Sequence, residues 1–328
     1  MIAVIGCGAW ATTVAKMCAE NGHHVKIWVH RPEYVNLFQV LLENTVALPG
    51  ISLPKMYASQ DMQEVLTNVS AILYCVPTKF TDTLQHFLDH EITAPVLCLS
   101  KGVIGPPHWT LCQHIEHTIA ASASSKKYHV GVLSGPNLAR EVAQQKPCAA
   151  VVGCRDEITA KMFAQLVTRP YFRVYFSVDR LGVAWGGILK NYLAITAGIA
   201  DGLGLGTNAK AALLTRGLAE MTRIATVFGG QKESIYGLSG VGDLIATCAS
   251  RESRNYQVGL SLAQNKEPLP GGSHAVAEGM KTVQFLKTWN DTEGLEIPIL
   301  TQLYQVLYAN LSVEKAMTAL LAREIREE

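Results

Sequence analysis

Short apolar runs alternate with amphipathic stretches through the first half of the chain. Each run is apolar along its whole length, which is typical of a strand buried on both faces of a parallel sheet. The intervening stretches show helical periodicity, for example Trp10–Glu20, Thr78–Leu88 and Asp156–Val167. The pattern therefore predicts a doubly wound α/β domain with a mostly parallel sheet, the Rossmann architecture. The predicted strands are Ile2–Ile5, Val25–Val29, Ala71–Val76, Pro95–Leu99, Val130–Leu133, Ala149–Val152 and Phe172–Tyr175.

Beyond about residue 178 the pattern changes to long helical stretches, several of them separated by paired glycines. No strand signal comparable to those of the first half occurs there. We therefore expect an N-terminal Rossmann domain of residues 1–178 and an all-helical C-terminal domain of residues 179–328. The predicted helices are Arg180–Gly198, Ala209–Phe228, Ser253–Ala263, Ala275–Lys287, Pro298–Leu311 and Val313–Ala322.

Composition and charge argue against several kinds of partner and cellular location. The chain has 328 residues with 28 lysines and arginines against 27 acidic residues, so its net charge gives no reason to expect nucleic acid or a membrane surface as partner. The N-terminus lacks the features of a signal peptide, and no stretch approaches the ~20 apolar residues of a membrane span. The eight cysteines are scattered without a CxxC pair, which argues against a zinc ribbon and thioredoxin-type chemistry and favours buried thiols in a reducing compartment; we expect no metal. We expect a cytoplasmic protein.

The first predicted strand runs directly into a glycine motif at the start of a helix. The motif reads Gly6-Cys7-Gly8-Ala9-Trp10-Ala11, the G-x-G-x-x-A form of the dinucleotide-binding turn. Gly6 permits the tight turn, Gly8 lets the backbone approach a pyrophosphate, and Ala11 allows close packing of helix on strand. The N–H groups at the helix N-terminus favour bound phosphate. A turn with glycines of purely structural use is the alternative.

The choice between NAD and NADP depends on the end of the second strand. NAD-binding proteins usually carry an acidic residue there, whereas this chain has His30 and Arg31, which suit the 2′-phosphate of NADP. Glu33 lies just beyond and competes as a ribose ligand. The sequence favours NADP and leaves NAD open, with an ordinary solvated Arg31 as the bland alternative.

Two polar segments follow strands of the predicted sheet. Lys101 comes directly after Pro95–Leu99, at a carboxyl end where open α/β sheets bind ligands. Asn137 follows Val130–Leu133 and either contacts a ligand or caps the next helix. Either residue is also compatible with an ordinary structural role.

Two more candidates lie in the helical half. Lys190 sits in an apolar helix, where burial disfavours the ammonium form and so suits a proton donor or acceptor, unless its stem reaches water. Asp243 ends a glycine-rich segment, and Ser253-Arg254-Asn255 begins a helix ten residues later. Arg254 and the helix N-terminus are suited to a phosphate, although a plain capped helix with a surface arginine gives the same pattern.

Taken together, these segments resemble bacterial-type NAD(P)-dependent sn-glycerol-3-phosphate dehydrogenase along almost the whole chain. The resemblance implies reversible reduction of dihydroxyacetone phosphate to sn-glycerol 3-phosphate, a precursor of glycerophospholipids, by a homodimer whose C-terminal domain is similar to that of 6-phosphogluconate dehydrogenase. The ordered motifs are G-C-G-A-W at 6–10, L-P-G at 48–50, K-G at 101–102, S-G-P-N-L-A-R-E-V-A at 134–143, G-G-I-L-K-N at 186–191, A-G-I-A-D-G-L-G-L-G-T-N-A-K-A-A-L at 197–213, T-R-G-L-A-E-M at 215–221, G-L-S-G-V-G-D-L at 237–244, S-R-N at 253–255 and A-E-G at 277–279.

The resemblance also implies roles for individual residues. Lys190 matches the lysine that exchanges the substrate proton, Asp243 the aspartate beside it, and Lys101 a lysine shared by substrate and cofactor. The remaining substrate-contact positions are Gly135, Asn137, Ser253, Arg254 and Asn255. The cofactor-contact positions are Gly6, Gly8, Ala9, Trp10, His30, Arg31, Lys101, Ala139, Arg254, Val276 and Glu278.

The sequence departs from the family pattern at a few places. Ala11 stands where glycine is common, Ala184 where glutamate is usual, Trp185 where a smaller aliphatic residue is common, and Ile104 where an acid is frequent. None of these changes removes a proposed catalytic or phosphate-binding group.

Two alternative functions remain: a related dehydrogenase of 3-hydroxy acids or nucleotide sugars, and a dinucleotide sensor without turnover. Oxidation of a nucleotide sugar to the acid would need a cysteine nucleophile, and only Cys248 lies near the proposed motifs.

Overall fold

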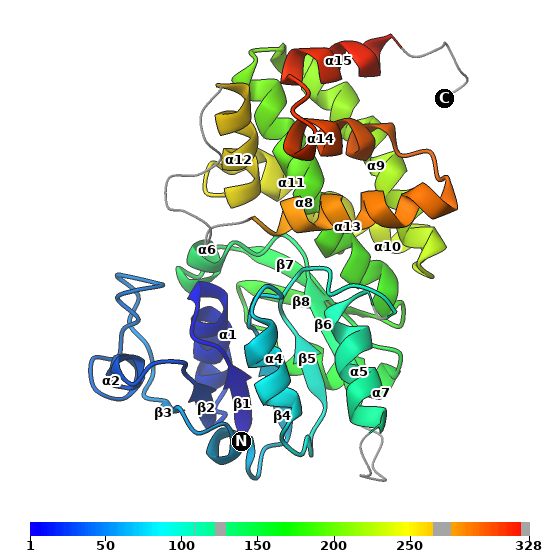
Figure 1. Ribbon diagram of the computed structural model, residues 1–328. Helices are drawn as coiled ribbons and strands as arrows, with labels where there is room; N and C mark the ends of the chain where they lie inside the picture. The colour runs from blue at the N-terminus through cyan, green and yellow to red at the C-terminus, as the bar shows by residue number, and fades with distance from the viewer. Residues whose placement is uncertain (108, 122–128, 265–276, 323–328) are drawn as a thin grey trace. The chain divides into compact units, whose positions relative to one another are not determined.

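The computed structural model describes residues 1–107, 109–121, 129–264 and 277–322 (Figure 1). The chain divides into two compact units, Met1–Ala184 and Trp185–Glu328. The division falls inside the long helix α8 (Arg180–Gly202). The first unit thus extends to Ala184 and includes the first residues of α8, whereas the sequence pattern changes at about residue 178.

The first unit is built on one eight-stranded sheet with the order β3-β2-β1-β4-β5-β6-β7-β8. Every neighbouring pair is parallel except β6 and β7, which run antiparallel. The order reverses at β1, and a doubly wound sheet binds its ligand at such a switch point. The predicted fold class is therefore confirmed. The strands are β1 (Ile2–Ile5), β2 (Val25–Trp28), β3 (Tyr57–Ser59), β4 (Ala71–Tyr74), β5 (Val96–Cys98), β6 (Val130–Ser134), β7 (Cys148–Gly153) and β8 (Phe172–Ser177).

Helices cover both faces of this sheet, and each face has its own apolar core (Figure 1). Successive strand residues point to opposite faces, so Val4 joins one core and Ile5 the other. The core containing Val4 takes residues from α1 (Ala9–Glu20), α2 (Glu33–Gln39), α6 (Ala139–Ala143) and α7 (Glu157–Val167), and the other takes residues from α3 (Met62–Leu66), α4 (Thr81–Leu88) and α5 (Leu111–Ala121). Burial on both faces explains why the central strands are apolar throughout.

The first residues of α8 are held in the sheet unit by a buried arginine. The Arg180 side chain is 1% exposed and donates to both carboxylate oxygens of Glu116 on α5, at 2.7 and 2.6 Å. It also donates to the Val130 carbonyl at 3.0 Å. Burial tends to raise the pKa of Glu116, but the hydrogen bonds and charge of Arg180 outweigh it and hold this pKa below its usual value.

The second unit is helical throughout its described residues, as predicted. Its helices after α8 are α9 (Gly206–Val227), α10 (Lys232–Tyr236), a short π-helix η1 (Leu238–Gly242), α11 (Asp243–Ala249), α12 (Arg254–Ala263), α13 (Glu278–Glu293), α14 (Pro298–Tyr308) and α15 (Val313–Leu321). Among the helices of the described residues, none is both long and apolar enough to cross a membrane.

Two glycines let α8 and α12 touch backbone to backbone. A Cβ on Gly198 would lie 2.1 Å from the Tyr256 carbonyl oxygen, and one on Gly259 would lie 2.0 Å from the Ile195 carbonyl oxygen. No other residue fits at either position without moving a helix. The contact fixes α12, which begins with Arg254, against the helix that carries Lys190.

Glu220 on α9 holds the start of α14. Its carboxylate is buried and accepts the backbone N–H groups of Ile299 at 2.6 Å and Leu300 at 3.2 Å. These are free donors of the first helical turn, and a negative charge suits this end of the helix dipole.

Candidate functional site

The glycine turn after β1 fits a dinucleotide. Gly6 has φ +115°, and a Cβ there would lie 3.1 Å from the Cys75 carbonyl oxygen, so only glycine suits the position. Gly8 is the N-cap of α1, and an added Cβ at Gly8 would meet nothing within 4 Å. No side chain caps α1, and its first turn, which starts with Ala9 and Trp10, has no acidic residue. The first-turn N–H groups thus have no side-chain cap or neighbouring carboxylate of the same turn, which suits them to a pyrophosphate.

Asn44 supports this turn, and the sequence interpretation missed it. Its fully buried amide donates to the Cys7 carbonyl at 2.9 Å and to the Thr12 hydroxyl at 2.8 Å. Thr13 in turn donates to the carbonyl of Ala139, the first residue of α6, at 3.1 Å. The only signal in the sequence was the position of Asn44 shortly before the L-P-G motif.

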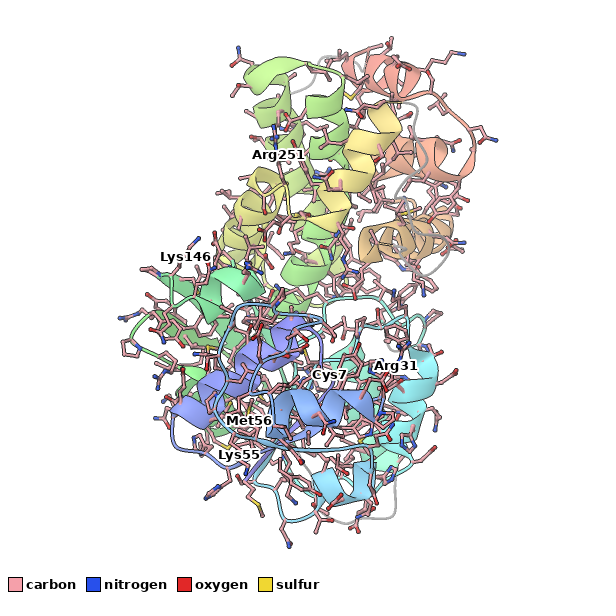
Figure 2. All side chains as sticks on the ribbon, turned by 90° about the vertical axis from the view of Figure 1, so that its left-hand side faces the viewer. Cys7, Arg31, Lys55, Met56, Lys146 and Arg251 are labelled. Carbon is pink, nitrogen blue, oxygen red and sulfur yellow. The ribbon has the colours of Figure 1, made fainter. Side chains whose placement is uncertain are left out.

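The residues expected to determine the preference for NAD or NADP lie just after β2. The His30 ring packs against Tyr34 with 5.0 Å between ring centroids, and its Nδ1 lies 3.4 Å from the Cys7 sulfur. Burial and the charge of Arg31 lower the pKa of His30, which favours the neutral ring. Arg31 lies 3.8 Å from Glu33, with both side chains more than 60% exposed, so this ion pair is weak. Figure 2 labels Cys7 and Arg31 in the unit that holds the sheet.

Lys101, Gly135 and Asn137 come together at the carboxyl ends of β5 and β6. The Lys101 ammonium donates to the Asn137 side-chain oxygen at 3.2 Å and to the Gly135 carbonyl at 3.4 Å. The Asn137 amide nitrogen is buried and, within the described residues, has no hydrogen-bond partner. An ammonium beside an unused donor suits an oxygen-rich ligand. The capping role considered for Asn137 is wrong, because the N-cap of α6 is Leu138.

Lys190 and Asp243 form a buried ion pair inside the helical unit. They are 9% and 2% exposed, and the Lys190 ammonium donates to the Asp243 carboxylate and to the Thr247 hydroxyl, the latter at 2.7 Å. Asp243 and Thr247 lie one turn apart on α11, so they present their oxygens on the same face. Sequence reasoning missed Thr247, although its spacing from Asp243 was a usable signal. The arrangement holds the lysine nitrogen in place.

The segment expected to bind phosphate begins α12. Ser253 is the N-cap and accepts the Tyr256 N–H at 3.3 Å, as predicted. Arg254 is the first helical residue and is exposed. Asn255 is engaged within the unit, because its amide donates to the Asn191 side chain at 2.9 Å and accepts the Gly279 N–H at 3.1 Å.

Of two further expected cofactor contacts, the structure describes one, which lies on α13. Glu278 is its first residue and is half-buried, while Val276 lies outside the described residues.

No cluster of three or more His, Cys, Asp or Glu side chains in the described ranges is placed to hold a metal. Burial raises the pKa of the Cys248 thiol to about 12, which leaves the thiol protonated and unsuited to act as a nucleophile.

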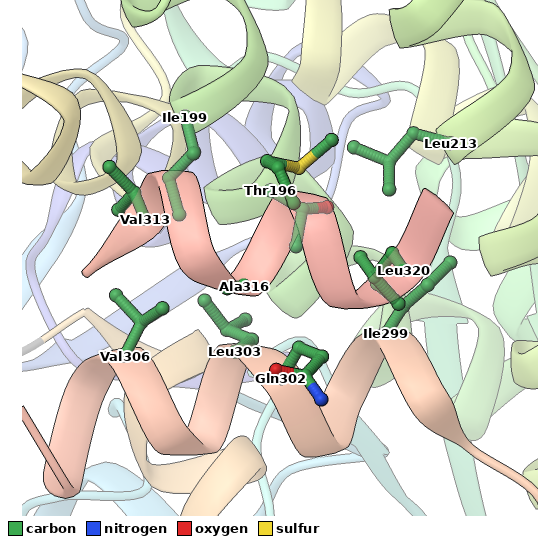
Figure 3. Close-up of a pocket in the computed structure, with 11 residues that line it drawn as sticks. Thr196, Ile199, Leu213, Ile299, Gln302, Leu303, Val306, Val313, Ala316 and Leu320 are labelled. Atoms are coloured by element: carbon green, nitrogen blue, oxygen red, sulfur yellow. The ribbon is translucent and has the colours of Figure 1, made fainter. Parts of the chain in front are cut away.

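A separate pocket of about 310 Å³, part of it open to solvent, lies among α8, α9, α14 and α15 (Figure 3). Its walls are aliphatic apart from Thr196, Gln302 and the sulfur of a methionine, so it offers no cation for a phosphate. The lining residues are Thr196, Ile199, Leu213, Ile299, Gln302, Leu303, Val306, Val313, Ala316, Met317 and Leu320. The pocket does not match the chemistry of the site around Lys190.

A Rossmann unit with an open glycine turn, followed by a helical unit with a buried lysine–aspartate pair, defines the class of two-domain NAD(P)-dependent dehydrogenases. Comparison with known proteins narrows this class. Residues 1–160 match the N-terminal model of NAD-dependent glycerol-3-phosphate dehydrogenase, and residues 179–318 match its C-terminal model. The chain belongs to the NAD-dependent glycerol-3-phosphate dehydrogenase family.

Individual relatives agree over their full lengths. The glycerol-3-phosphate dehydrogenase [NAD(P)+] of Solidesulfovibrio magneticus is 39% identical, over 100% of this chain and 99% of that protein. The crystal structure of glycerol-3-phosphate dehydrogenase from Coxiella burnetii superposes with a TM-score of 0.87 at 32% identity, covering 98% of both chains. The enzyme structure from Saccharomyces cerevisiae gives 0.82 at 29% identity, over 98% of this chain and 99% of that one. The resemblance expected from the motifs is confirmed.

Proposed function

We propose that the protein catalyses the reversible NAD(P)H-dependent reduction of dihydroxyacetone phosphate to sn-glycerol 3-phosphate. The family and the names of the relatives support this reaction. The observation that carries it is the buried Lys190–Asp243 pair with Thr247, since reduction of a ketone needs one proton delivered to the developing alkoxide. When bound, the reduced dinucleotide supplies the hydride that goes to C2 of the substrate.

Lys190 gives its proton to the C2 oxygen as that oxygen gains charge, and in the reverse direction it takes the proton from the alcohol. Asp243 accepts a hydrogen bond from the lysine nitrogen and orients it, while Thr247 holds the same nitrogen from a second side. Lys101, placed by Asn137, adds a second ammonium that stabilises charge on oxygen.

Arg254 and the N-terminus of α12 hold the substrate phosphate. The guanidinium is exposed at the first helical residue, next to the backbone donors of a ten-residue helix. The turn at Gly6 and Gly8 takes the pyrophosphate of the dinucleotide, and Arg31 takes the 2′-phosphate of NADP.

The test is a spectrophotometric assay of wild-type protein with NADPH or NADH and dihydroxyacetone phosphate, run beside 3-oxo acids as alternative substrates. We expect oxidation of the reduced dinucleotide only with the triose phosphate. Turnover restricted to an oxo acid would favour the 3-hydroxy acid alternative. Cofactor binding without turnover of any substrate would favour the sensor.

An Arg254→Ala variant examines the phosphate role separately. It should raise KM for dihydroxyacetone phosphate by about 10- to 100-fold, as expected for loss of a charge-assisted hydrogen bond. KM for the dinucleotide is measured in the same series. If KM for the triose phosphate and kcat both stay at wild-type values, Arg254 does not bind the phosphate.

We further propose a homodimer in the cytoplasm, as the resemblance to the family implies. Sedimentation equilibrium of the purified protein tests the dimer, and a single species at the monomer mass would contradict it. Fractionation of the producing cells tests the location.

A further inference from the structure

The long motif at residues 197–213 has no role in the site described so far, yet it holds two charged residues that meet in the structure. Asp201 lies at the end of α8 and Lys210 in the first turns of α9, and the Lys210 ammonium donates to the Asp201 carboxylate at 2.6 Å. The Tyr256 hydroxyl on α12 donates to the same carboxylate oxygen at 2.5 Å. One carboxylate therefore joins three helices.

Lys210 makes a further contact with the helix that carries Asp243 and Thr247. Its ammonium donates to the Cys248 carbonyl at 3.3 Å, in the last turn of α11. A cation at this end of a helix satisfies a free carbonyl and suits the helix dipole. The ammonium also lies 5.5 Å from the centroid of the Tyr256 ring.

The contacts within this cluster shift the pKa values of Asp201 and Tyr256. Burial tends to raise the pKa of Asp201, but hydrogen bonds from Lys210 and Tyr256 outweigh it and hold the pKa below its usual value. Burial and the Asp201 carboxylate raise the pKa of Tyr256 to about 12, so the hydroxyl stays protonated and remains a donor. The charges of both ion pairs, Lys190–Asp243 and Lys210–Asp201, act on the pKa of the Cys248 thiol. Both pairs therefore lie near Cys248, in the last turn of α11.

We propose that Asp201, Lys210 and Tyr256 form a positioning cluster for the reaction. Through Lys210 the cluster fixes the end of α11, and so the oxygens that hold Lys190. Through Tyr256 it fixes α12, which begins with the phosphate-binding arginine. This inference rests on the proposed function. It predicts that loss of the Tyr256 contact raises KM and that loss of the Lys210 contacts lowers kcat.

The experiment compares single variants, each of which removes one polar group of the cluster. Tyr256→Phe keeps the ring and loses the hydrogen bond, so it should raise KM for dihydroxyacetone phosphate about 5- to 20-fold with kcat within about 2-fold. Lys210→Met keeps the stem and loses the ammonium, so it should lower kcat about 5- to 20-fold, and Lys210→Arg should restore most of that loss. The dissociation constant for NADPH should stay within about 2-fold, since the proposed pyrophosphate site is in the other unit.

Matched controls come from a similar cluster elsewhere in the helical unit. Lys287 pairs with Asp291 on α13 and lies 5.6 Å from the ring centroid of Tyr304 on α14, so these residues are on other helices than α11 and α12. Lys287→Met and Tyr304→Phe should leave kcat and KM at wild-type values. Thermal unfolding of every variant shows whether a loss of folded protein explains a loss of activity.

The positioning role is wrong if Tyr256→Phe and Lys210→Met leave KM and kcat unchanged, or if they change activity no more than the Lys287→Met and Tyr304→Phe controls do. Amide hydrogen exchange gives a readout that needs no substrate: the cluster variants should speed exchange in α11 and α12 but not in α1. A wild-type protein that fails to reduce dihydroxyacetone phosphate would contradict the proposed function instead, and exchange would still decide whether the cluster fixes the two helices.

Discussion

Replacing Lys190 separates the structural effect of the buried ion pair from its chemistry. The Lys190→Met variant keeps a side chain of similar length but leaves the Asp243 carboxylate, 2% exposed, without its ammonium partner. Removing one member of a buried pair typically costs about 3–5 kcal/mol. The Thr247 hydroxyl lies 3.4 Å from the same carboxylate oxygen and can donate to it, which offsets about 1 kcal/mol. We therefore expect a loss of about 2–4 kcal/mol in the free energy of unfolding.

The double variant Lys190→Met/Asp243→Asn removes both charges and should recover most of this stability. Its activity should not recover, because the proton donor is still missing. Both variants should lose about 10²- to 10⁴-fold in kcat, as expected for a positioned acid. The stability loss and the rate loss thus respond differently to the second substitution.

The assays are thermal unfolding by circular dichroism and NADPH-linked turnover of dihydroxyacetone phosphate on the same preparations. Stability losses of 2–4 kcal/mol should lower Tm by about 5–15 °C in the single variant. A single variant with wild-type turnover would refute the proton-transfer role of Lys190. A double variant no more stable than the single one would refute the claim that the unpaired carboxylate causes the loss.

Three further predictions concern other charged groups. Arg31→Asp should lower the NADPH/NADH ratio of kcat/KM at least about 10-fold, because the weak pair with Glu33 leaves Arg31 available for a 2′-phosphate; an unchanged ratio would contradict this. Because Arg180 lowers the folded-state pKa of Glu116, stability is present above the ordinary value of 4.5 and is lost as pH falls through the folded pKa. Urea unfolding from pH 6 to 3 should therefore show a smaller loss in Glu116→Gln than in wild type, and equal losses would argue against the pair. Glu220→Gln should cost about 1.5–3 kcal/mol in urea unfolding, since two N–H groups lose a charged acceptor, and a wild-type midpoint would refute that role.

The sequence predicts the central sheet well because burial on both faces makes its strands apolar throughout. It misses β3 (Tyr57–Ser59), an edge strand with an exposed tyrosine and no apolar run. It also misses short elements such as α2, α3 and η1, whose few residues carry no full helical period. Helix ends are shifted as well, since α13 runs to Glu293 where the pattern predicts an end at Lys287.

The sequence likewise predicts some residues of the candidate site and misses others. The glycine turn is visible in the sequence because its chemistry is local, with glycines at fixed spacing between a strand and a helix. Asn44 and Thr247 are harder to find, because their partners Cys7 and Lys190 lie far away along the chain and only their spacing from nearby motifs gives a signal. The substrate role of Asn255 came from the resemblance alone, and it stays a prediction beside the hydrogen bonds this residue makes within its unit.

The backbone contact between α8 and α12 has a consequence for how this enzyme can change. At Gly198 and Gly259 the spacing of the two helices is set by main-chain atoms, so it cannot be tuned by exchanging one side chain for another of different size. Even a single methyl group would push the helix that begins with Arg254 away from the helix that carries Lys190. A variant adapted to a longer or shorter phosphate ester must therefore change the loop before α12, because exchange of side chains cannot change the distance between these two helices.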